Sequence, residues 1–407
     1  MRHKCLFFSP GFPPPFIGGS LVYYYYLLSK CKEDDLVVVT RRKINSDEID
    51  SQTPYPIHRT QWIPDPGDSR LKRLICYMLL LPMLVIWIIK YRVSVLHLGA
   101  LPDIIPGWLT SRITGCSLVV TIMGEDLTTK PVGNSSLFFR WLRFIHFKAA
   151  VAALRRTECV QTIATFGKTV LLQIGVPENR IAIITPGIDI AKTTSEIKID
   201  PVIASRLKGK RVLLTVGRLL PRKGQDMVIR ALPQLIGQYP DLRYVMVGCG
   251  YPPKRKEYCE QLARELGVQD FVLALDDLDN ASVAWLYHAC EVFIMANRTM
   301  PDGNTEGYGI VFLEAGAWGK PVIGGRAGGA VDAVDEGVTG LLVDGANVED
   351  IEHAIIKLLS DRELATRMGE AGRQKASRNG WDLKATQYLE MLARLIGESS
   401  KKQILIR

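Results

Sequence analysis

This chain of 407 residues lacks several features that would assign it to common classes of protein. Its eight cysteines are scattered without a Cys-x-x-Cys pair, so no zinc site is indicated and reduced core cysteines in a cytosolic protein are expected. No helix-turn-helix, RNP-like or zinc-finger pattern is evident, which argues against nucleic acid as a partner. No signal peptide is evident, because residues 1–8 are too short and run into a Pro/Gly loop. We therefore expect the protein on the cytoplasmic side of the membrane.

Negative charge is scarce in the first half of the chain. Residues 1–190 contain 22 Lys or Arg against 14 Asp or Glu, which accounts for +8 of the net charge of +9. A basic half of this kind predicts an anionic partner. Since no nucleic-acid-binding motif accompanies the charge, an anionic membrane surface is the better prediction.

The longest apolar run is also short for a membrane span. Residues 74–89 are 16 uncharged residues, whereas a transmembrane helix needs about 20, and Pro82 interrupts them. Basic residues flank the run, namely Arg70, Lys72, Arg73, Lys90 and Arg92. The pattern predicts a helix at the interface of an anionic bilayer, with a buried helix of the N-terminal domain as the alternative. Residues 137–156, where aromatic and basic residues alternate, are a second candidate.

The length predicts two domains of roughly 200 residues, and the pattern within each predicts a parallel α/β sheet. Short apolar runs alternate with helical stretches in both halves, as crossover connections require. In the first half, strands are expected at residues 5–9, 35–40, 94–98, 117–122, 157–163 and 180–184. In the second half, they are expected at residues 212–216, 243–248, 271–275, 292–295, 321–324 and 340–343.

The most informative segment is residues 306–324, where two carboxylates lie around a helix start. The apolar stretch 310–317 predicts a helix, and glycines just before it allow the backbone close to a ligand. Unpaired N–H groups and the helix dipole make such a start suitable for a phosphate. Glu314 would lie about two turns into the helix, where a carboxylate can accept from both ribose hydroxyls, and Glu306 lies before it. Two unrelated surface glutamates are the alternative.

A second segment, residues 212–226, has the pattern of a buried strand followed by a basic loop. The β-branched run 212–216 is typical of a parallel strand covered on both faces, and an amphipathic helix follows the loop. Arg218 and Lys223 are therefore expected at the carboxyl end of a strand, where open α/β sheets bind ligands. Two solvated loop cations are the alternative, but a diphosphate leaving group needs cations in such a place.

Both segments resemble the donor-site motifs of the family 4 retaining glycosyltransferases, through Glu-Gly-Tyr-Gly-Ile-Val-Phe-Leu-Glu-Ala and the loop Pro-Arg-Lys-Gly-Gln-Asp. The resemblance covers the whole chain and is nearest to bacterial mannosyltransferases that act on phosphatidylinositol mannosides. It implies the GT-B fold, in which two Rossmann-like α/β domains face each other across a cleft. The implied parts are an acceptor domain (1–190), a linker (191–205), a nucleotide-sugar domain (206–380) and a C-terminal helix (381–407) that returns to the first domain.

The resemblance also implies a donor site residue by residue. The implied catalytic residues are Arg218, Lys223 and Glu306. The implied donor-binding residues are Gly19, Gly217, Tyr308, Gly309, Ile310, Val311 and Glu314. The cations and the N–H groups at the helix start would stabilise the leaving diphosphate of an oxocarbenium-like transition state. No cofactor is required, because the nucleoside-diphosphate sugar is the substrate. A divalent metal is not indicated but is left open as an alternative.

The predicted activity is transfer of a sugar, with retention, from a GDP- or UDP-linked donor to a membrane lipid or a cell-surface glycan precursor. The predicted location is peripheral, on the inner face of the cell membrane. A GT-B epimerase, which needs no acceptor, and a phosphorylase, which needs a pocket for free phosphate, are the rival enzymes. A donor-binding scaffold without transferase activity is the rival from another class.

Two positions depart from the family pattern in the first domain. Many relatives carry a histidine in the segment that matches residues 119–126, where this chain has Met123. The common His-x-His is His97-Leu-Gly here, and His97 is expected to be a core residue. Glu125 and Asp126 are the nearby carboxylates that could replace the missing imidazole, with solvated side chains as the alternative.

Two further features have weaker assignments. The loop that ends in Gly18-Gly19 follows the first strand, and the resemblance places it near the diphosphate. The carboxylates Asp276 and Asp277 fall where an acceptor for guanine N1 and N2 would lie, or they cap the following helix.

Overall fold

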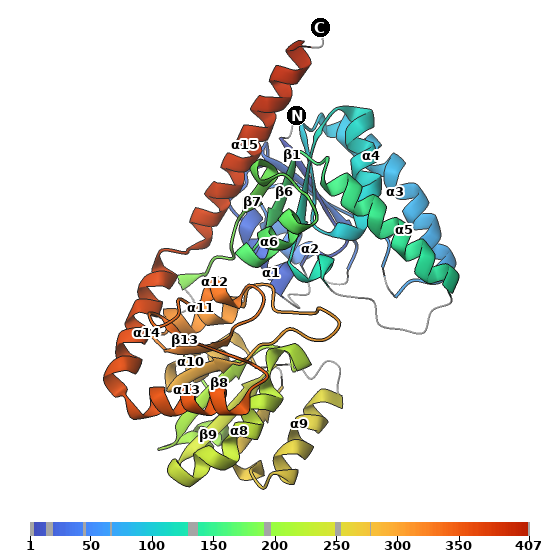
Figure 1. Ribbon diagram of the computed structural model, residues 1–407. Coiled ribbons are helices and arrows are strands. Elements are labelled where there is room, and N and C mark those ends of the chain that lie inside the picture. Colours follow the sequence, from blue (N-terminus) through green and yellow to red (C-terminus); the bar gives the residue numbers. More distant parts are fainter. Residues whose placement is uncertain are drawn as a thin grey trace. The chain divides into compact units, whose positions relative to one another are not determined.

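The structure is a computed structural model that describes residues 4–13, 19–43, 46–65, 67–128, 137–190, 197–248, 254–276 and 278–405. The chain divides into two compact units, each built on one parallel sheet with helices on both faces (Figure 1). The first unit comprises Met1–Leu127, Pro131–Pro186 and Trp381–Arg407, and the second comprises Thr128–Lys130 and Gly187–Gly380.

The first unit has a seven-stranded parallel sheet of order β3-β2-β1-β4-β5-β6-β7. Its strands are β1 (Cys5–Ser9), β2 (Leu36–Arg41), β3 (Ile57–Thr60), β4 (Val95–Leu98), β5 (Ser117–Ile122), β6 (Cys159–Thr162) and β7 (Ile181–Ile183). Strand β3 was not predicted, because it is a half-exposed edge strand of four residues with no apolar run. The other strands lie where the sequence pattern placed them.

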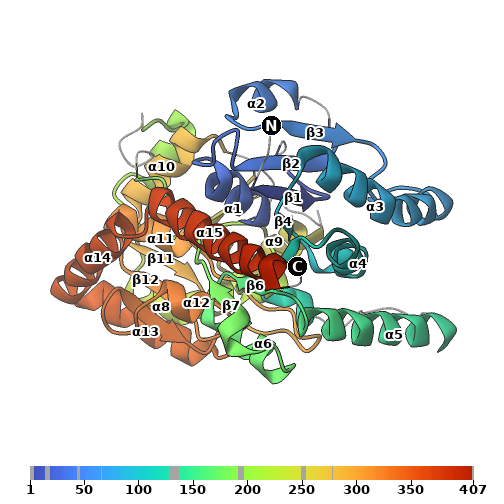
Figure 2. The same cartoon turned by 90° about the horizontal axis from the view of Figure 1, so that it is seen from above.

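Helices cover both faces of this sheet. On one face α3 (Arg70–Tyr91), α4 (Ile104–Thr114) and α5 (Leu137–Leu154) lie side by side (Figure 2). Their inner residues, such as Leu84, Ile104 and Leu154, form one core with alternate strand residues, such as Leu6 and Phe8. The other face carries α1 (Gly19–Leu28) and α15 (Trp381–Leu405), which contact each other. The short helices α2 (Asp47–Gln52) and α6 (Thr165–Gln173) complete the unit.

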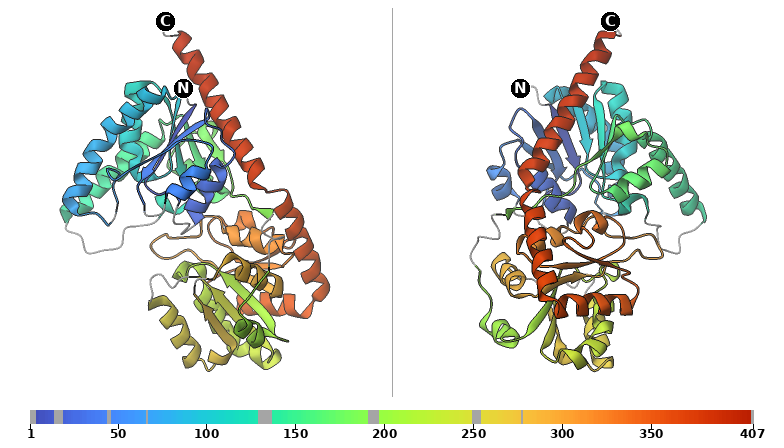
Figure 3. Two further views of the ribbon diagram at one scale, coloured as in Figure 1. Left: turned by 180° about the vertical axis from the view of Figure 1, so that it is seen from behind. Right: turned by 60° about the vertical axis from the view of Figure 1, so that its left-hand side comes forward.

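Helix α15 is held against the first sheet by a buried polar contact. The hydroxyl of Tyr388 lies 2.8 Å from Nδ1 of His97 on β4, and Nε2 of His97 lies 2.7 Å from Thr121 Oγ1 on β5. Figure 3 shows α15, in red, alongside this sheet. Burial lowers the pKa of His97 to about 3, so the imidazole is neutral at physiological pH. The prediction that His97 is a core residue is confirmed.

Helix α3 has two apolar faces. Cys76, Leu80, Leu84 and Ile88 are buried, whereas the outer face is exposed. By length and composition alone residues 71–91 could cross a membrane, and only 22% of the apolar stretch is buried within the protein, less than in the core helix of a soluble protein. The expected interruption at Pro82 does not occur: the helix continues through this exposed residue, because Leu80 and Leu84 anchor it on both sides.

The second unit has a six-stranded parallel sheet of order β10-β9-β8-β11-β12-β13. Its strands are β8 (Arg211–Val216), β9 (Leu242–Val247), β10 (Val272–Leu275), β11 (Val292–Met295), β12 (Val322–Gly325) and β13 (Gly340–Val343). Its helices are α7 (Pro201–Leu207), α8 (Gln225–Gln238), α9 (Lys254–Glu265), α10 (Asn280–Ala289), α11 (Ile310–Ala317), α12 (Ala330–Ala333), α13 (Val348–Ser360) and α14 (Arg362–Ser377). Helix α7 lies partly within the segment 191–205 that was expected to be a linker.

The strand order of the second sheet indicates where a ligand binds. Strand order reverses between β8 and β11, and open α/β sheets bind ligands beyond the carboxyl ends of the strands at such a switch point. The loop after β8 carries the predicted cations, and the connection after β11 leads to Glu306 and α11. The topology therefore brings the two sequence segments to one edge of one sheet.

Seven of the eight cysteines are buried and form no disulfide, and Cys249 lies outside the described residues. Burial raises the pKa of the Cys259 thiol to about 11, which keeps it protonated and unreactive. The seven described cysteines are core residues, as predicted.

Candidate active site

The loop after β8 is shaped by two glycines in left-handed backbone conformations. Gly217 has φ +136, and a side chain on it would meet Nζ of Lys223 at 3.4 Å. Gly224 has φ +75, and a Cβ there would lie 1.9 Å from the carbonyl oxygen of Ala296. The turn between them, Pro221–Lys223, therefore packs against the connection after β11, with Arg222 and Lys223 buried.

The start of α11 is a second glycine turn. Gly309 precedes the helix with φ 84, and a Cβ there would clash with the ring of Phe312 at 2.7 Å. This turn points the first N–H groups of α11 out of the helix, where an anion is stabilised by them and by the dipole. Met295 joins the two turns: its Sδ lies 3.4 Å from Lys223 Nζ, and its Cε would lie 3.3 Å from a Cβ on Gly309.

Glu306 is buried between two cations. Its Oε2 forms an ion pair with Arg222 and lies 3.1 Å from Nζ of Lys223. Burial acts to raise the pKa of Glu306, but the charges of Lys223 and Arg222 outweigh it and hold the pKa below its usual value. Burial lowers the pKa of Lys223, although Glu306 counteracts part of this effect. The carboxylate is therefore ionised at neutral pH.

Glu314 lies about one turn into α11 rather than two as expected, because the helix begins at Ile310. The hydroxyl of Tyr287 on α10 donates a 2.8 Å hydrogen bond to Oε2 of Glu314. Tyr287 is buried against Phe293 of β11, and Phe293 packs edge-on against Phe312 of α11. This aromatic stack fixes α10 relative to α11. The carboxylate of Glu314 is thus oriented by a side chain of another helix. A carboxylate that binds a ribose needs such a fixed orientation.

The connection from β11 to Glu306 is held by side-chain bonds. Arg298 donates from its backbone N–H to the carbonyl of Arg222 at 2.8 Å, and from its guanidinium to Asp226 on α8 at 2.8 Å. Asn297 accepts from the N–H of Gly325 and donates to the carbonyl of Ala327. These bonds fix the start of the connection that leads to Glu306.

The structure brings most of the predicted donor-site residues together. Lys223 and Glu306 are in contact, Gly217 is beside Lys223, and Arg218 follows Gly217 in the same loop. Tyr308, Gly309, Ile310, Val311 and Glu314 form the start and the middle of α11. Gly19 is the first residue of α1 in the other unit, exposed and with open space around it. The roles assigned to these residues stay predictions.

The weaker candidates have local partners. Oδ2 of Asp126 accepts from the N–H of Met123 at 2.6 Å, in a short 3₁₀ turn after β5. Asp276 forms a 2.6 Å ion pair with Lys256. Asp277 and Gly18 lie outside the described residues, and the side chain of Glu125 is not among those described.

The sequence analysis did not identify two residues that contact the predicted site glutamates. Arg222 lies inside the Pro-Arg-Lys-Gly motif, so a signal was present, but nothing in the sequence distinguished it from a solvated arginine. Tyr287 lies on α10, 27 residues before Glu314, and only the fold brings the two together.

Comparison with known proteins identifies the family. Residues 198–375 match the family model "Glycosyl transferases group 1", and residues 17–192 match "Glycosyltransferase Family 4". The GDP-mannose-dependent alpha-(1-6)-phosphatidylinositol monomannoside mannosyltransferase of Mycolicibacterium smegmatis is 32% identical over 85% of this chain and 86% of its own. The D-inositol 3-phosphate glycosyltransferase of Corynebacterium urealyticum is 37% identical over 52% of this chain and 50% of its own.

Solved structures share the fold over the full length. Sucrose-phosphate synthase from Thermosynechococcus elongatus has a TM-score of 0.77 at 20% identity, over 98% of this chain and 100% of its own. Anabaena HepE in complex with UDP-glucose has a TM-score of 0.74 at 21% identity, over 96% of this chain and 99% of its own.

Two parallel-sheet units of this topology have the GT-B fold, which these solved structures share. The family matches show a glycosyltransferase, an enzyme that uses a nucleotide sugar. The chain belongs to glycosyltransferase family 4.

Proposed function

We propose that this enzyme transfers a sugar with retention from a nucleoside-diphosphate sugar to a lipid acceptor at the inner face of the cell membrane. One observation carries the donor half: Glu306 is held by buried cations directly before a helix whose N–H groups face outward. The Mycolicibacterium relative is named for GDP-mannose and a phosphatidylinositol mannoside, so GDP-mannose and an inositol phospholipid are the first substrates to test.

The mechanism follows from where negative charge develops. As the bond to the anomeric carbon breaks, charge accumulates on the leaving diphosphate, and Arg218, Lys223 and the N–H groups at the start of α11 stabilise it. Glu314 holds the ribose, and Glu306 orients the sugar through its hydroxyls. Retention then results from attack of the acceptor hydroxyl on the face from which the diphosphate leaves, and the hydroxyl proton passes to the leaving phosphate.

The acceptor half of the proposal rests on the outer face of α3, α4 and α5, which we call the apolar face. Its exposed residues are Leu71, Leu74, Ile75, Tyr77, Met78, Leu79, Ile86 and Ile89 on α3, Leu109 and Ile113 on α4, and Phe144, Ile145 and Phe147 on α5. Exposed apolar residues on three neighbouring helices support an interaction site there. Basic residues lie among them, with Lys90 over the Trp87 ring and Lys148 over the Phe144 ring, as at the surface of an anionic bilayer.

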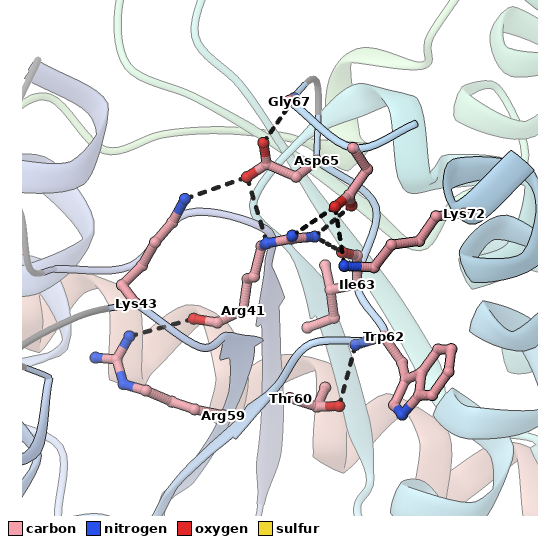
Figure 4. A network of polar contacts seen from close by, with 10 residues as sticks. Arg41, Lys43, Arg59, Thr60, Trp62, Ile63, Asp65, Gly67 and Lys72 are labelled. Atoms are coloured by element: carbon pink, nitrogen blue, oxygen red, sulfur yellow. Dashed lines mark hydrogen bonds and ion pairs between the residues drawn. The ribbon is translucent and has the colours of Figure 1, made fainter. Parts of the chain in front are cut away.

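The basic flank at the start of α3 is partly neutralised (Figure 4). Lys72 lies 3.0 Å from Asp68, and Asp68 also accepts two hydrogen bonds from Arg41. Asp65 accepts from Lys43 in the same network. These bonds anchor the start of α3 to β2, so the charges at its other end, Lys90 and Arg92, are the better candidates for attraction to a bilayer.

Vesicle binding tests the membrane half of the proposal. We expect co-sedimentation with anionic vesicles that weakens between about 50 and 500 mM salt, because screening shortens the Debye length severalfold. Replacing Met78, Ile86 and Ile89, which are 70%, 62% and 66% exposed, by Gln should abolish binding without unfolding the protein. The matched control replaces Val202 and Val338, exposed residues of the second unit, by Gln, and this variant should bind the vesicles normally. A wild-type protein that stays in solution at low salt would rule out the membrane half.

A donor and acceptor panel tests the function as a whole. GDP-, UDP- and ADP-sugars are incubated with and without inositol phospholipid, and glycolipid product, free nucleotide and epimerised sugar are measured. Glycolipid formed only with acceptor supports the transferase. Epimerised donor without acceptor identifies an epimerase, and nucleotide binding without any turnover identifies a scaffold.

A further inference from the structure

We infer that Arg222 is a positioning residue, the fixed partner that keeps the carboxylate of Glu306 in place when Lys223 turns to the donor diphosphate. The inference rests on the proposed function, since it concerns the same donor site. It gives a role to a buried arginine for which the donor mechanism has no use.

The charge balance of the site requires such a partner. Arg222, Lys223 and Glu306 are 7%, 8% and 8% exposed, and both cations contact the same oxygen, Oε2 of Glu306. A buried carboxylate without a cation is strongly disfavoured. If Lys223 were the sole partner of Glu306, a diphosphate that binds Lys223 would leave Glu306 uncompensated. With Arg222 present, Lys223 is available to the donor.

The backbone around Arg222 is held in place. Its carbonyl accepts from the N–H of Arg298, whose guanidinium is bonded to Asp226 at the start of α8. Gly224, two residues on, packs against the carbonyl of Ala296. The planar guanidinium of Arg222 is therefore presented to Glu306 from a fixed backbone.

Lys223 has the opposite character. Besides Glu306, its Nζ contacts the sulfur of Met295, which is a weak acceptor. The backbone of Gly217, which has no side chain, also lies beside it. The ammonium group of Lys223 is on a flexible stem, and its second acceptor is weak. Its charge-assisted hydrogen bonds to a phosphate should therefore be worth more than the contact with Glu306 that it gives up.

The formal charges fit this division of labour. Arg218, Arg222 and Lys223 against Glu306 give the site a formal net charge of +2, which balances the two negative charges of the donor diphosphate. Since both cations use Oε2, Oε1 is the carboxylate oxygen expected to accept from a sugar hydroxyl. Arg222 thus acts on the reaction through Glu306.

The test measures proton uptake when a nucleoside diphosphate binds, by titration calorimetry at pH 7 in buffers of different ionisation enthalpy. The probe is GDP or UDP, whichever binds the wild type. Wild-type protein should take up almost no proton. Arg222→Met should take up nearly one, because Glu306 loses its last cation to the ligand and protonates. Arg222→Lys should restore the wild-type result, and Arg230→Ala, an exposed arginine on α8, should match it.

Turnover provides a second measurement. In Arg222→Met the acid limb of the kcat profile should move to higher pH, and kcat at pH 7 should fall on the order of 10-fold or more. A merely structural role would lower activity equally at every pH. Unchanged proton uptake in an Arg222→Met protein that still binds nucleotide would overturn the inference. Loss of nucleotide binding in both Arg222→Met and Arg222→Gln, with Arg222→Lys normal, would instead place Arg222 on the diphosphate and overturn it too. Failure of the wild type to bind any nucleotide would refute the proposed function itself.

Discussion

The hydroxyl of Tyr287 donates a hydrogen bond of 2.8 Å to the carboxylate of Glu314. The bond joins helices α10 and α11 of the second unit, and the side chain of Tyr287 is buried. An acceptor that is already oriented loses little freedom when a ribose binds, so part of the affinity for nucleotide should depend on this tyrosine.

Replacing Tyr287 by Phe removes one hydrogen bond of about 1 kcal/mol, and we expect affinity for the free nucleoside diphosphate to fall roughly fivefold. Glu314→Gln should lower it further, because the ribose contact does not depend on the sugar. Tyr258→Phe, on an exposed side chain of the same unit, is the control. Calorimetric titration with GDP and UDP measures the effect, and unchanged affinity in Glu314→Gln would contradict the assigned role.

Lys223→Ala and Arg218→Ala each remove a charge that interacts more strongly as the leaving group becomes anionic. We expect kcat/KM to fall on the order of 10²-fold or more in each variant. Steady-state kinetics of wild type and variants, with the donor sugar identified by the donor and acceptor panel, measure this loss. Near-normal turnover in either variant would show that the donor site lies elsewhere.

Glu306→Gln should separate turnover from nucleotide affinity. The amide can still hydrogen-bond but cannot pair with two cations, so the sugar should be held poorly while the nucleoside diphosphate binds nearly as in the wild type. We expect a lower kcat with little change in affinity for free nucleotide. Equal loss of nucleotide affinity in Glu306→Gln and Glu314→Gln would refute the separate roles.

Chelation with EDTA should leave turnover unchanged, because protein cations supply the charge at the diphosphate. Asp279, which shares an Asp-x-Asp spacing with Asp277, caps α10 by accepting from the N–H of Ser282 at 2.7 Å. Activity that disappears with EDTA and returns with Mg²⁺ or Mn²⁺ would show that a metal takes part.

Asp103 predicts a pH dependence of stability. It is buried before α4, its Oδ2 has no hydrogen-bond partner in the described part of the chain, and burial raises its pKa to about 7. The folded state therefore retains a proton that the unfolded chain loses near its ordinary pKa of 3.8, so stability falls as pH rises from about 4 to 7. Asp103→Asn should remove this loss and melt higher at pH 8 than the wild type, with little gain at pH 4. Asp34→Asn, on an exposed residue, should show neither effect in thermal melts.

The sequence predicted the strand, the helix and the glycine turns around the expected donor site, because each of them follows from a local sequence pattern. Strand β8 and helix α11 follow from apolar runs, and glycines at 217, 224 and 309 stand where φ is positive. The parallel order of the strands then brings Lys223 to Glu306 without any further information.

What sequence reasoning missed depends on contacts between distant segments. Strand β3 pairs with β2 at the edge of the sheet, and its four residues contain no apolar run that would have predicted it. The pairing of Arg222 with Glu306 spans 84 residues. The apolar face was only half predicted, because the pattern of α3 is equally apolar on its buried and its exposed sides, and only packing shows which side faces the sheet.

The place of Tyr388 in the first sheet has a consequence for biosynthesis. The second unit is formed mainly by the continuous segment Gly187–Gly380, which leaves the ribosome before α15 does. The first unit needs the hydroxyl of Tyr388 beside His97, so its core stays incomplete until the last helix is translated. We therefore expect the unit that is made first to be completed last, because its sheet lacks the cover of α15 until that helix has been translated.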